Sequence, residues 1–231
     1  MYCIGSDWRI GMDSFNLLRE DNSFIENEYQ NNNSNYLGVI FSGIGYTLGN
    51  PLLYYSRNIL IENKIDYFGI NFGYTKNENY KSLNQENKNK YFINDNKIII
   101  NKILELRKNY NQIFLIGKSL GTGTIRQCIK IDTIKNVSVL ILLTPPGVEW
   151  ENTINEIKDT NIKTLVIGSL RDKLYSVKNL SEIHGRKHIK ILELEEGDHS
   201  LETGNFKKDI EQLKMIMEAT NEFIKENILT N

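Results

Sequence analysis

The residues best suited to chemistry lie in a Gly-x-Ser-x-Gly motif at positions 117–121, with Ser119 at its centre. An apolar run precedes the motif and a helix-compatible segment follows it. This is the pattern of a strand that turns sharply into a helix and exposes its middle residue in a strained conformation. Gly117 and Gly121 fit such a turn, because the two backbones cross too closely there for a Cβ. A serine hydroxyl is a weak nucleophile, so this interpretation requires a base and an orienting acid elsewhere in the chain.

A phosphate-binding loop is an alternative interpretation of the same motif, since Gly117-Lys118-Ser119 matches the last residues of such a loop. That loop also needs a glycine five residues before Gly117, which makes the turn that cradles the anion. Position 112 is Gln and lies within the predicted strand. The phosphate-loop interpretation is therefore excluded.

Histidine is scarce in this chain, which narrows the choice of base. The sequence contains three histidines, His184, His188 and His199, and all of them follow Ser119. The first falls in a predicted helix and the second begins the last predicted strand, both ordinary structural positions. His199 comes just after that strand, and the carboxyl ends of the strands are where sites form in an open parallel sheet. We therefore predict His199 as the base.

The orienting acid should follow a strand that lies between the serine and the histidine in the sequence. Asp172 comes four residues after the apolar segment 165–168, in a turn from which its side chain can enter the same crevice. Its ordinary alternatives are a helix N-cap or a salt bridge with Arg171. Glu149, after the preceding strand, is the principal rival. Asp198 is disfavoured, because successive side chains of an extended segment point apart and it adjoins the histidine.

Short apolar segments of strand length alternate with helical ones and would position these residues. Strands are predicted at residues 36–42, 65–72, 112–117, 137–143, 163–168 and 188–193. Helices are predicted from Pro51, over 91–110, 120–131 and 151–158, for about ten residues after Asp172, and at the C-terminus around residues 206–224. Such alternation implies parallel strands with helices on both faces.

We predict a single doubly wound α/β domain over residues 1–231. Residues 1–35 carry little pattern and are expected to hold one or two short edge strands. The polar, Asn-rich stretch of residues 75–90 shows no periodicity and is interpreted as a surface loop or a partly disordered segment.

Composition excludes several classes of partner. The 28 basic and 29 acidic residues balance, so no overall field favours nucleic acid or an anionic membrane. No apolar run approaches the roughly 20 residues that span a bilayer, and residues 1–10 do not form a signal peptide. Cys3 and Cys128 show no metal-like spacing and suit a reducing compartment. We expect a cytoplasmic protein with no nucleic-acid or membrane partner, and the oligomeric state is left open.

The order Ser119, Asp172, His199, each after a strand, resembles the α/β-hydrolase superfamily. The segments GKSLG, GSLRD and GDHSL around them are most similar to those of its short dienelactone-hydrolase-like and esterase-like members. The resemblance covers residues 36–225. It implies the α/β-hydrolase fold and a serine hydrolase that needs no metal or organic cofactor. It also implies an oxyanion hole formed by the backbone N–H of Leu120 and, from the loop after an early strand, that of Ile44, with Gly45 as the next candidate.

Two other functions stay open at this stage. The glycines of residues 43–49 follow a strand, as in a dinucleotide-binding loop. Pro51 nevertheless places the helix start beyond them, and no acidic residue closes the next strand at the required distance. A hydrolase fold can also serve as a catalytically silent binding protein.

The substrate is constrained by the absence of room for a lid. In the family that the sequence resembles, lids usually follow the strand before the acid strand, and here residues 144–162 contain little beyond one short helix. We therefore expect an open pocket shaped by Tyr46, Thr144, Pro145 and further by Pro146 and Trp150. Such a pocket favours a small or openly accessible acyl ester or thioester as the small-molecule substrate.

Two cations flank the predicted site in the sequence, Lys118 and Arg171. They could favour an anionic substrate, but we interpret both as charges that face solvent.

Overall fold

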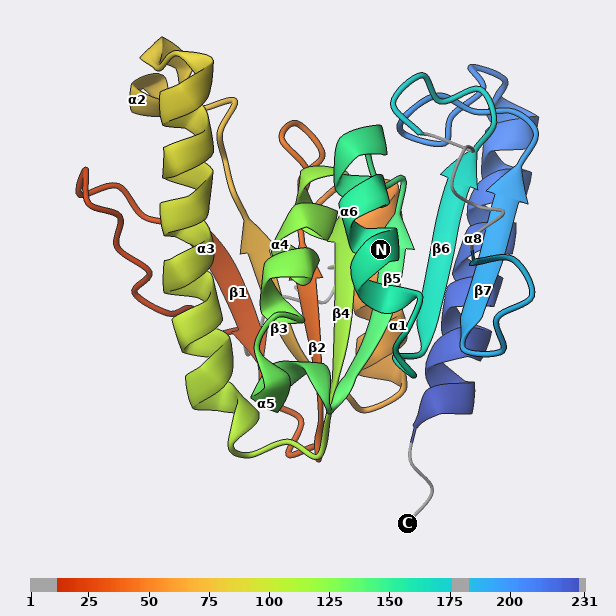
Figure 1. The fold of residues 1–231 in the computed structure, drawn as a ribbon, viewed down its shortest axis with the longest axis horizontal. Helices are drawn as coiled ribbons and strands as arrows, with labels where there is room; N and C mark the ends of the chain where they lie inside the picture. The colour runs from red at the N-terminus through yellow and green to blue at the C-terminus, as the bar shows by residue number, and fades with distance from the viewer. Residues whose placement is uncertain (1–11, 176–182, 229–231) are drawn as a thin grey trace, which may run out of the picture.

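The computed structural model describes residues 12–175 and 183–228, and only the backbone of residues 148–150. Its centre is a seven-stranded sheet with the strand order β1-β3-β2-β4-β5-β6-β7 (Figure 1). The strands are β1 (Glu26–Gln30), β2 (Tyr36–Phe41), β3 (Asp66–Asn71), β4 (Gln112–Lys118), β5 (Ser138–Leu143), β6 (Thr164–Ser169) and β7 (Ile189–Leu194). Neighbouring strands pair in parallel except β1, which is antiparallel to β3. The predicted mostly parallel sheet is confirmed, and β1 is one of the expected edge strands.

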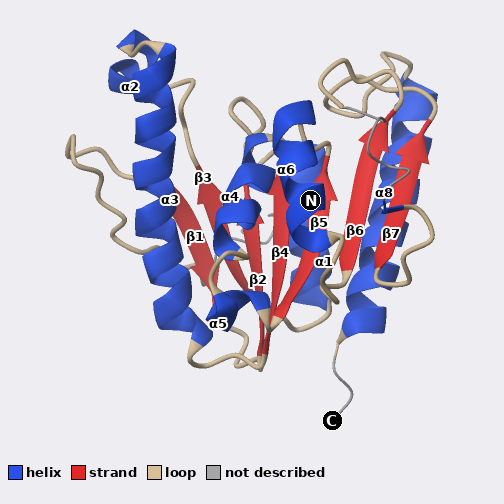
Figure 2. Cartoon of the chain, in the orientation of Figure 1, coloured by secondary structure: helices blue, strands red, loops and turns tan. Residues whose placement is uncertain are grey.

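Helices cover both faces of this sheet, as Figure 2 shows. They are α1 (Pro51–Glu62), α2 (Glu78–Ser82), α3 (Gln85–Arg107), α4 (Leu120–Cys128), α5 (Asp132–Lys135), α6 (Gly147–Ile157) and α8 (Phe206–Asn227). In Figure 1, α3, α4 and α6 lie in front of the sheet, and α1 and α8 lie behind it. The helix predicted after Asp172 falls largely on residues 176–182, outside the described residues.

The apolar core has two parts, one on each face of the sheet, because successive strand side chains point to opposite faces. Strand β4 shows this alternation. All seven of its residues are buried, and they divide between the two faces. Ile113 and Leu115 belong to the core under α3, α4 and α6. Phe114 and Ile116 belong to the core under α1 and α8. A strand buried on both faces matches its nearly continuous apolar sequence.

The polar stretch of residues 75–90 is not a loop, and that prediction is wrong. It contains α2 and the first turns of α3, and an asparagine side chain caps each helix. The Oδ1 atoms of Asn77 and Asn84 each accept a hydrogen bond of 2.9 Å, from the N–H groups of Tyr80 and Asn87. Such caps satisfy donors that a helix start leaves unpaired, and they stabilise a helix without any apolar periodicity.

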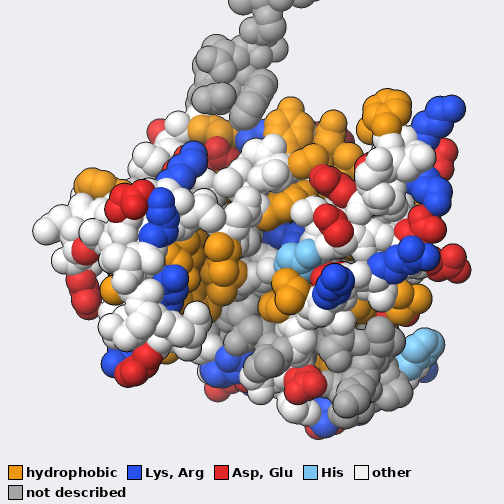
Figure 3. Space-filling model, turned by 90° about the horizontal axis from the view of Figure 1, so that it is seen from above, with side chains coloured by type: hydrophobic (Ala, Val, Ile, Leu, Met, Phe, Trp, Pro, Cys, Tyr) orange, Lys and Arg blue, Asp and Glu red, His pale blue; other side chains and the backbone are white. Residues whose placement is uncertain are grey.

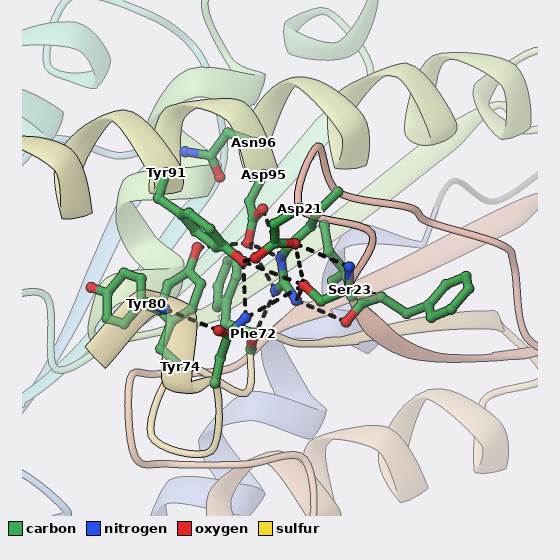
Figure 4. A network of polar contacts seen from close by, with 12 residues as sticks. Asp21, Ser23, Phe72, Tyr74, Tyr80, Tyr91, Asp95 and Asn96 are labelled. Carbon is green, nitrogen blue, oxygen red and sulfur yellow. Dashed lines mark hydrogen bonds and ion pairs between the residues drawn. The ribbon is translucent and has the colours of Figure 1, made fainter. Parts of the chain in front are cut away.

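A buried ion pair holds the N-terminal segment and α3 to the sheet (Figure 4). The Nε and Nη2 atoms of Arg19 donate to the carboxylate of Asp95 over 2.9–3.0 Å, and the two residues are 5% and 1% exposed. The other N–H groups of Arg19 donate to the Ser23 hydroxyl and to the carbonyls of Phe24 and Phe72. Every hydrogen-bonding group of this guanidinium therefore has an acceptor.

Tyrosines extend this network toward the surface. The Tyr74 hydroxyl donates to Asp95 over 2.8 Å, and burial raises the pKa of Tyr74 far above its ordinary value. The Tyr91 hydroxyl donates to Asp21 and accepts from the side-chain amide of Asn77, each over 2.8 Å. The network thus connects the N-terminal segment, the end of β3, α2 and α3.

Within the described ranges, none of the helices combines the length and the apolar character of a membrane span.

Candidate active site

Ser119 stands at the turn between β4 and α4, in a strained backbone conformation. Its φ of 52° and ψ of −113° lie in a region that L-residues rarely adopt, and its N–H donates to the carbonyl of Leu143 over 2.9 Å. A Cβ on Gly117 would lie 2.7 Å from the carbonyl of Gly121, and a Cβ on Gly121 would lie 2.5 Å from the carbonyl oxygen of Phe41. The predicted close crossing of strand and helix is therefore present.

His199 lies in the loop that follows β7, and its Nε2 is 2.7 Å from the Ser119 Oγ. The loop is shaped by the neighbouring carboxylate of Asp198, whose Oδ1 accepts from the N–H groups of Ser200 and Glu202 over 2.7 and 3.1 Å. Asp198 is thus engaged with its own loop. The imidazole is 29% exposed, so one side of it is open to a ligand.

Asp172 lies beyond β6 and approaches the imidazole from the other side. Its Oδ2 is 2.7 Å from the Nδ1 of His199, and its Oδ1 accepts from the N–H of Leu174 over 2.9 Å. The side chain is 1% exposed. A continuous line of short contacts therefore runs from Ser119 through His199 to Asp172, across the carboxyl ends of three strands.

The other candidates for base and acid lie elsewhere. His188 is at the start of β7, where its Nε2 is 3.4 Å from the carbonyl of Ile157, and His184 is an exposed turn residue. The side chain of Glu149 lies outside the described residues. Of the acidic side chains that the structure describes, Asp172 is the one in hydrogen-bond contact with His199.

Ser169, which the sequence does not single out, joins the loop of Asp172 to the loop of His199. Its hydroxyl donates to the carbonyl of Gly197 over 2.7 Å and accepts from the N–H of Arg171 over 3.2 Å. The side chain is completely buried. A small hydroxyl residue at the very end of a strand, just before the acid, was the available signal.

The two groups expected to form the oxyanion hole both border the turn at Ser119. Leu120 is the first residue of α4, so its N–H has no acceptor within the helix. The loop after β2 lies against the same turn, since a Cβ on Gly43 would be 3.6 Å from the Cβ of Ser119. Among the described residues, the N–H of Ile44 in this loop has no hydrogen-bond acceptor. This placement favours a role beside the serine over the dinucleotide-binding alternative.

The three residues expected to shape the pocket have different surroundings. Tyr46 lines an apolar cavity of about 160 Å³ next to the His199 loop, together with Leu52, Leu201, Leu213 and Ile216. Thr144 and Pro145 are buried and do not line this cavity.

Thr144 follows β5 in a left-handed conformation with φ 44°, and its buried hydroxyl has no partner among the described residues.

Large apolar side chains surround the carboxyl ends of the strands. Figure 3 looks onto this end of the molecule and shows hydrophobic side chains gathered on it among charged ones. Ile44, Leu170 and Leu174 are each about half exposed, at 48%, 50% and 54%. Ile44 comes from the loop after β2. Leu170 and Leu174 come from the loop after β6, which also holds Asp172. Exposed apolar side chains gathered in this way often mark a contact surface.

The two cations predicted to face solvent differ from each other. Arg171 is exposed, but Lys118 is 1% exposed, so the prediction is wrong for Lys118. Strand alternation places Lys118 on the same face as Phe114 and Ile116, and its ammonium lies 5.0 Å from the centre of the Tyr46 ring. Burial lowers the pKa of Lys118 to about 8, although the charges of Asp172 and Asp198 act in the opposite direction.

In the part of the chain that the structure describes, no group of three or more His, Cys, Asp or Glu side chains is placed to hold a metal ion.

Comparison with known proteins places this fold in a class. A family model described as an alpha/beta hydrolase domain matches residues 39–227. The chain therefore belongs to the α/β-hydrolase family, which confirms the predicted fold and makes it a hydrolase. Among curated protein sequences, none matches this chain.

Solved structures with the same fold share little sequence with this chain. A lidless α/β serine hydrolase from Xanthomonas campestris is 14% identical, covers 85% of this chain and 84% of its own, and has a TM-score of 0.60. An esterase from Pyrococcus furiosus is 13% identical, with 93% and 92% covered and a TM-score of 0.65. Est1E from Butyrivibrio proteoclasticus, with ferulic acid bound, is 12% identical, with 90% and 97% covered and a TM-score of 0.65. These likenesses show the fold.

Proposed function

We propose that this protein is a serine hydrolase that cleaves a small or openly accessible acyl ester or thioester through Ser119, His199 and Asp172. The observation that carries the proposal is the unbroken line of two 2.7 Å contacts from the serine hydroxyl to the buried carboxylate. Membership of the α/β-hydrolase family supports hydrolysis as the reaction class.

In the proposed reaction, His199 accepts the hydroxyl proton as Ser119 attacks the carbonyl carbon, and Asp172 fixes the tautomer of the imidazole. The negative charge that develops on the carbonyl oxygen is stabilised by the N–H groups of Ile44 and Leu120. His199 then returns the proton to the leaving group. Water activated by His199 releases the acyl group from Ser119.

The substrate class is inferred from the space around the site. Helix α6 fills the link between β5 and β6, so the position where a lid would be inserted holds one short helix. A structural relative binds ferulic acid, which supports a small organic acid as the product. We further propose a cytoplasmic location, which the free and buried thiol of Cys128 supports.

Turnover of p-nitrophenyl acetate tests the proposal. We expect turnover by the wild type, its loss in Ser119→Ala and His199→Ala, and its retention in the control Ser82→Ala, which alters an exposed serine on α2. A fluorophosphonate should label the wild type on Ser119 and leave Ser119→Ala unlabelled. Equal labelling of the two proteins contradicts the assignment. A wild type without turnover or labelling favours the silent binding protein.

The acyl preference is tested separately with a series of p-nitrophenyl esters. We expect acetyl and butyryl esters to be cleaved with a higher kcat/KM than esters of long-chain acids. The opposite order would refute the small acyl substrate and leave the three-residue assignment intact.

A further inference from the structure

Lys118 is a buried cation beside the nucleophile that the proposed reaction does not yet use. It precedes Ser119 directly, is 1% exposed, and has its ammonium 5.0 Å from the centre of the Tyr46 ring. Among the described residues, the ammonium donates no hydrogen bond and forms no ion pair at contact distance. A charge buried without such partners carries a large desolvation penalty, and a Met of similar size would fill the same space without it.

Charged groups from several elements act on this ammonium. Asp172, from the loop after β6, and Asp198, from the loop after β7, are the anions whose field favours its charged form. Tyr46, from the loop after β2, contributes the face of its ring. The hydroxyl of Tyr46 accepts from the N–H of Leu52 at the start of α1, and the ring lies within the fields of Glu202 and Asp198. The anionic field at Lys118 therefore comes from both loops that position His199.

We propose that Lys118 is the counter-charge of the catalytic residues: its ammonium offsets the negative charges of Asp172 and Asp198 and provides positive potential near Ser119, where negative charge develops on the substrate carbonyl oxygen. This inference rests on the proposed hydrolase function and assigns a positioning residue to the same site. The side chain of Asp172 is 1% exposed, so water screens its interaction with a nearby positive charge only weakly. A fixed cation in a water-poor site also acts on developing charge more strongly than it would in water.

Direct recognition of a substrate anion is a weaker explanation. Lys118 is nearly sealed from solvent and is not among the residues that line the cavity next to the His199 loop. A through-space effect on Asp172 and on the developing charge needs no such access.

If the ammonium supports the reaction, kcat/KM should depend on the protonation of Lys118. The ammonium loses its proton around pH 8, because burial lowers the pKa of Lys118 from 10.5 to about 8. Below that pH the counter-charge is present, and above it the site becomes more negative by one charge. The value of kcat/KM should therefore fall as the pH rises through about 8.

The test is the pH profile of kcat/KM for p-nitrophenyl acetate in wild type, Lys118→Met, Lys118→Arg and the control Arg171→Met. At pH 7 we expect Lys118→Met to be about tenfold or more below wild type and to lack the decline near pH 8. Lys118→Arg should keep a larger share of the activity and move the decline to higher pH. The control, which removes an exposed cation from the same rim, should leave the profile unchanged. A decline near pH 8 that persists in Lys118→Met refutes the proposal.

An NMR titration of Lys118 tests the counter-charge without measuring activity, so it separates this inference from the proposed hydrolase function. In protein labelled with ¹³C at the lysine Cε, one resonance should titrate near pH 8, be missing in Lys118→Met, and titrate at lower pH in Asp172→Asn. A Lys118 resonance that titrates above pH 10, or one that Asp172→Asn leaves unmoved, refutes the counter-charge. A wild type that shows the expected titration but no Ser119-dependent turnover refutes the proposed hydrolysis and leaves the charge coupling standing.

Discussion

Arg19 and Lys118 are buried to nearly the same degree, 5% and 1% exposed, yet their surroundings are opposite. Every N–H of Arg19 meets an acceptor, and its charge is paired with Asp95 at 2.9 Å. The ammonium of Lys118 faces an aromatic ring and has only distant anions among the described residues. A fully satisfied buried charge fixes the position of chain segments, whereas an unsatisfied one retains potential that can act on a ligand.

The backbone shows the same contrast between the two regions. Three non-glycine residues with positive φ, Ser119, Thr144 and Leu201, follow β4, β5 and β7 at the carboxyl edge of the sheet. Asn22, in the N-terminal segment near Arg19, also has a positive φ, but asparagine adopts this conformation readily. Of the described positive-φ residues that are neither glycine nor asparagine, three therefore lie at the edge that holds the site and one, Lys64, lies between α1 and β3. The turn near Arg19 uses a residue suited to it.

The largest effect is expected from a substitution of Asp172. Replacing Asp172 by Asn should lower kcat by about 10⁴-fold, because an amide favours the wrong imidazole tautomer, and should change stability little. The matched control is Asp198→Asn, whose amide oxygen can still accept from Ser200 and Glu202 and which should lose less than about tenfold. Steady-state kinetics with p-nitrophenyl acetate check this. Equal losses in the two variants would show that Asp172 is not the acid.

The next largest effect is on stability, at the Arg19 network beside the end of β3. Arg19→Met leaves the buried carboxylate of Asp95 unpaired and should lower the free energy of unfolding by about 3–5 kcal/mol. Activity per folded molecule should be unchanged. Urea denaturation measures the loss, with Arg171→Met as a control expected to stay within about 0.5 kcal/mol of wild type. If Arg19→Met is as stable as the control, the network does not stabilise the fold.

The contribution of Lys118 to the free energy of unfolding should depend on pH. Below pH 8 the folded and unfolded chains both hold the lysine proton, so burial of the charge destabilises the fold in full. Between about pH 8 and 10.5 the folded chain has lost the proton and the unfolded chain has not, so the free energy of unfolding rises with pH. The rise should reach roughly 3 kcal/mol.

Lys118→Met should lack this rise and should be the more stable protein at pH 7. The difference in urea midpoint between wild type and Lys118→Met, followed from pH 7 to 10.5, measures it. A constant difference would mean that Lys118 titrates normally in the folded protein.

The smallest effect tests the strain at the nucleophile. Ser119→Gly should raise the free energy of unfolding by about 1–2 kcal/mol, because glycine adopts a φ of 52° at little cost. Ser119→Ala removes the same hydroxyl but keeps the strain, so the comparison of the two isolates the backbone contribution. Thermal unfolding of both variants measures it. Equal stability would indicate that the turn is not strained.

The elements that could be predicted from the sequence are those in which one short segment determines its own structure. The buried strands were recognisable as apolar runs, and the turn at Ser119 from the spacing of its two glycines. Ser119, Asp172 and His199, singled out because each follows a strand, lie together in the structure. The carboxyl ends of parallel strands share one edge, which makes such a prediction possible without knowledge of the contacts.

What could not be predicted depends on contacts between distant segments or on local hydrogen bonds without periodicity. The Arg19–Asp95 pair joins residues 76 positions apart, and no local pattern marks either one. The helices within residues 75–90 depend on the caps of Asn77 and Asn84. The burial of Lys118 was within reach, since the alternation along β4 places it on a buried face.

The hydrogen bond from Ser169 to Gly197 has a consequence for the timing of the proposed reaction. It joins the loop of Asp172 to the loop of His199 through groups of the protein alone, so neither residue has to be brought into place by a substrate. His199 lies beside Ser119, with its Nε2 2.7 Å from the hydroxyl oxygen. In a rapid-mixing experiment, release of the first equivalent of p-nitrophenol should therefore begin without a lag, at a rate set by the attack on the carbonyl.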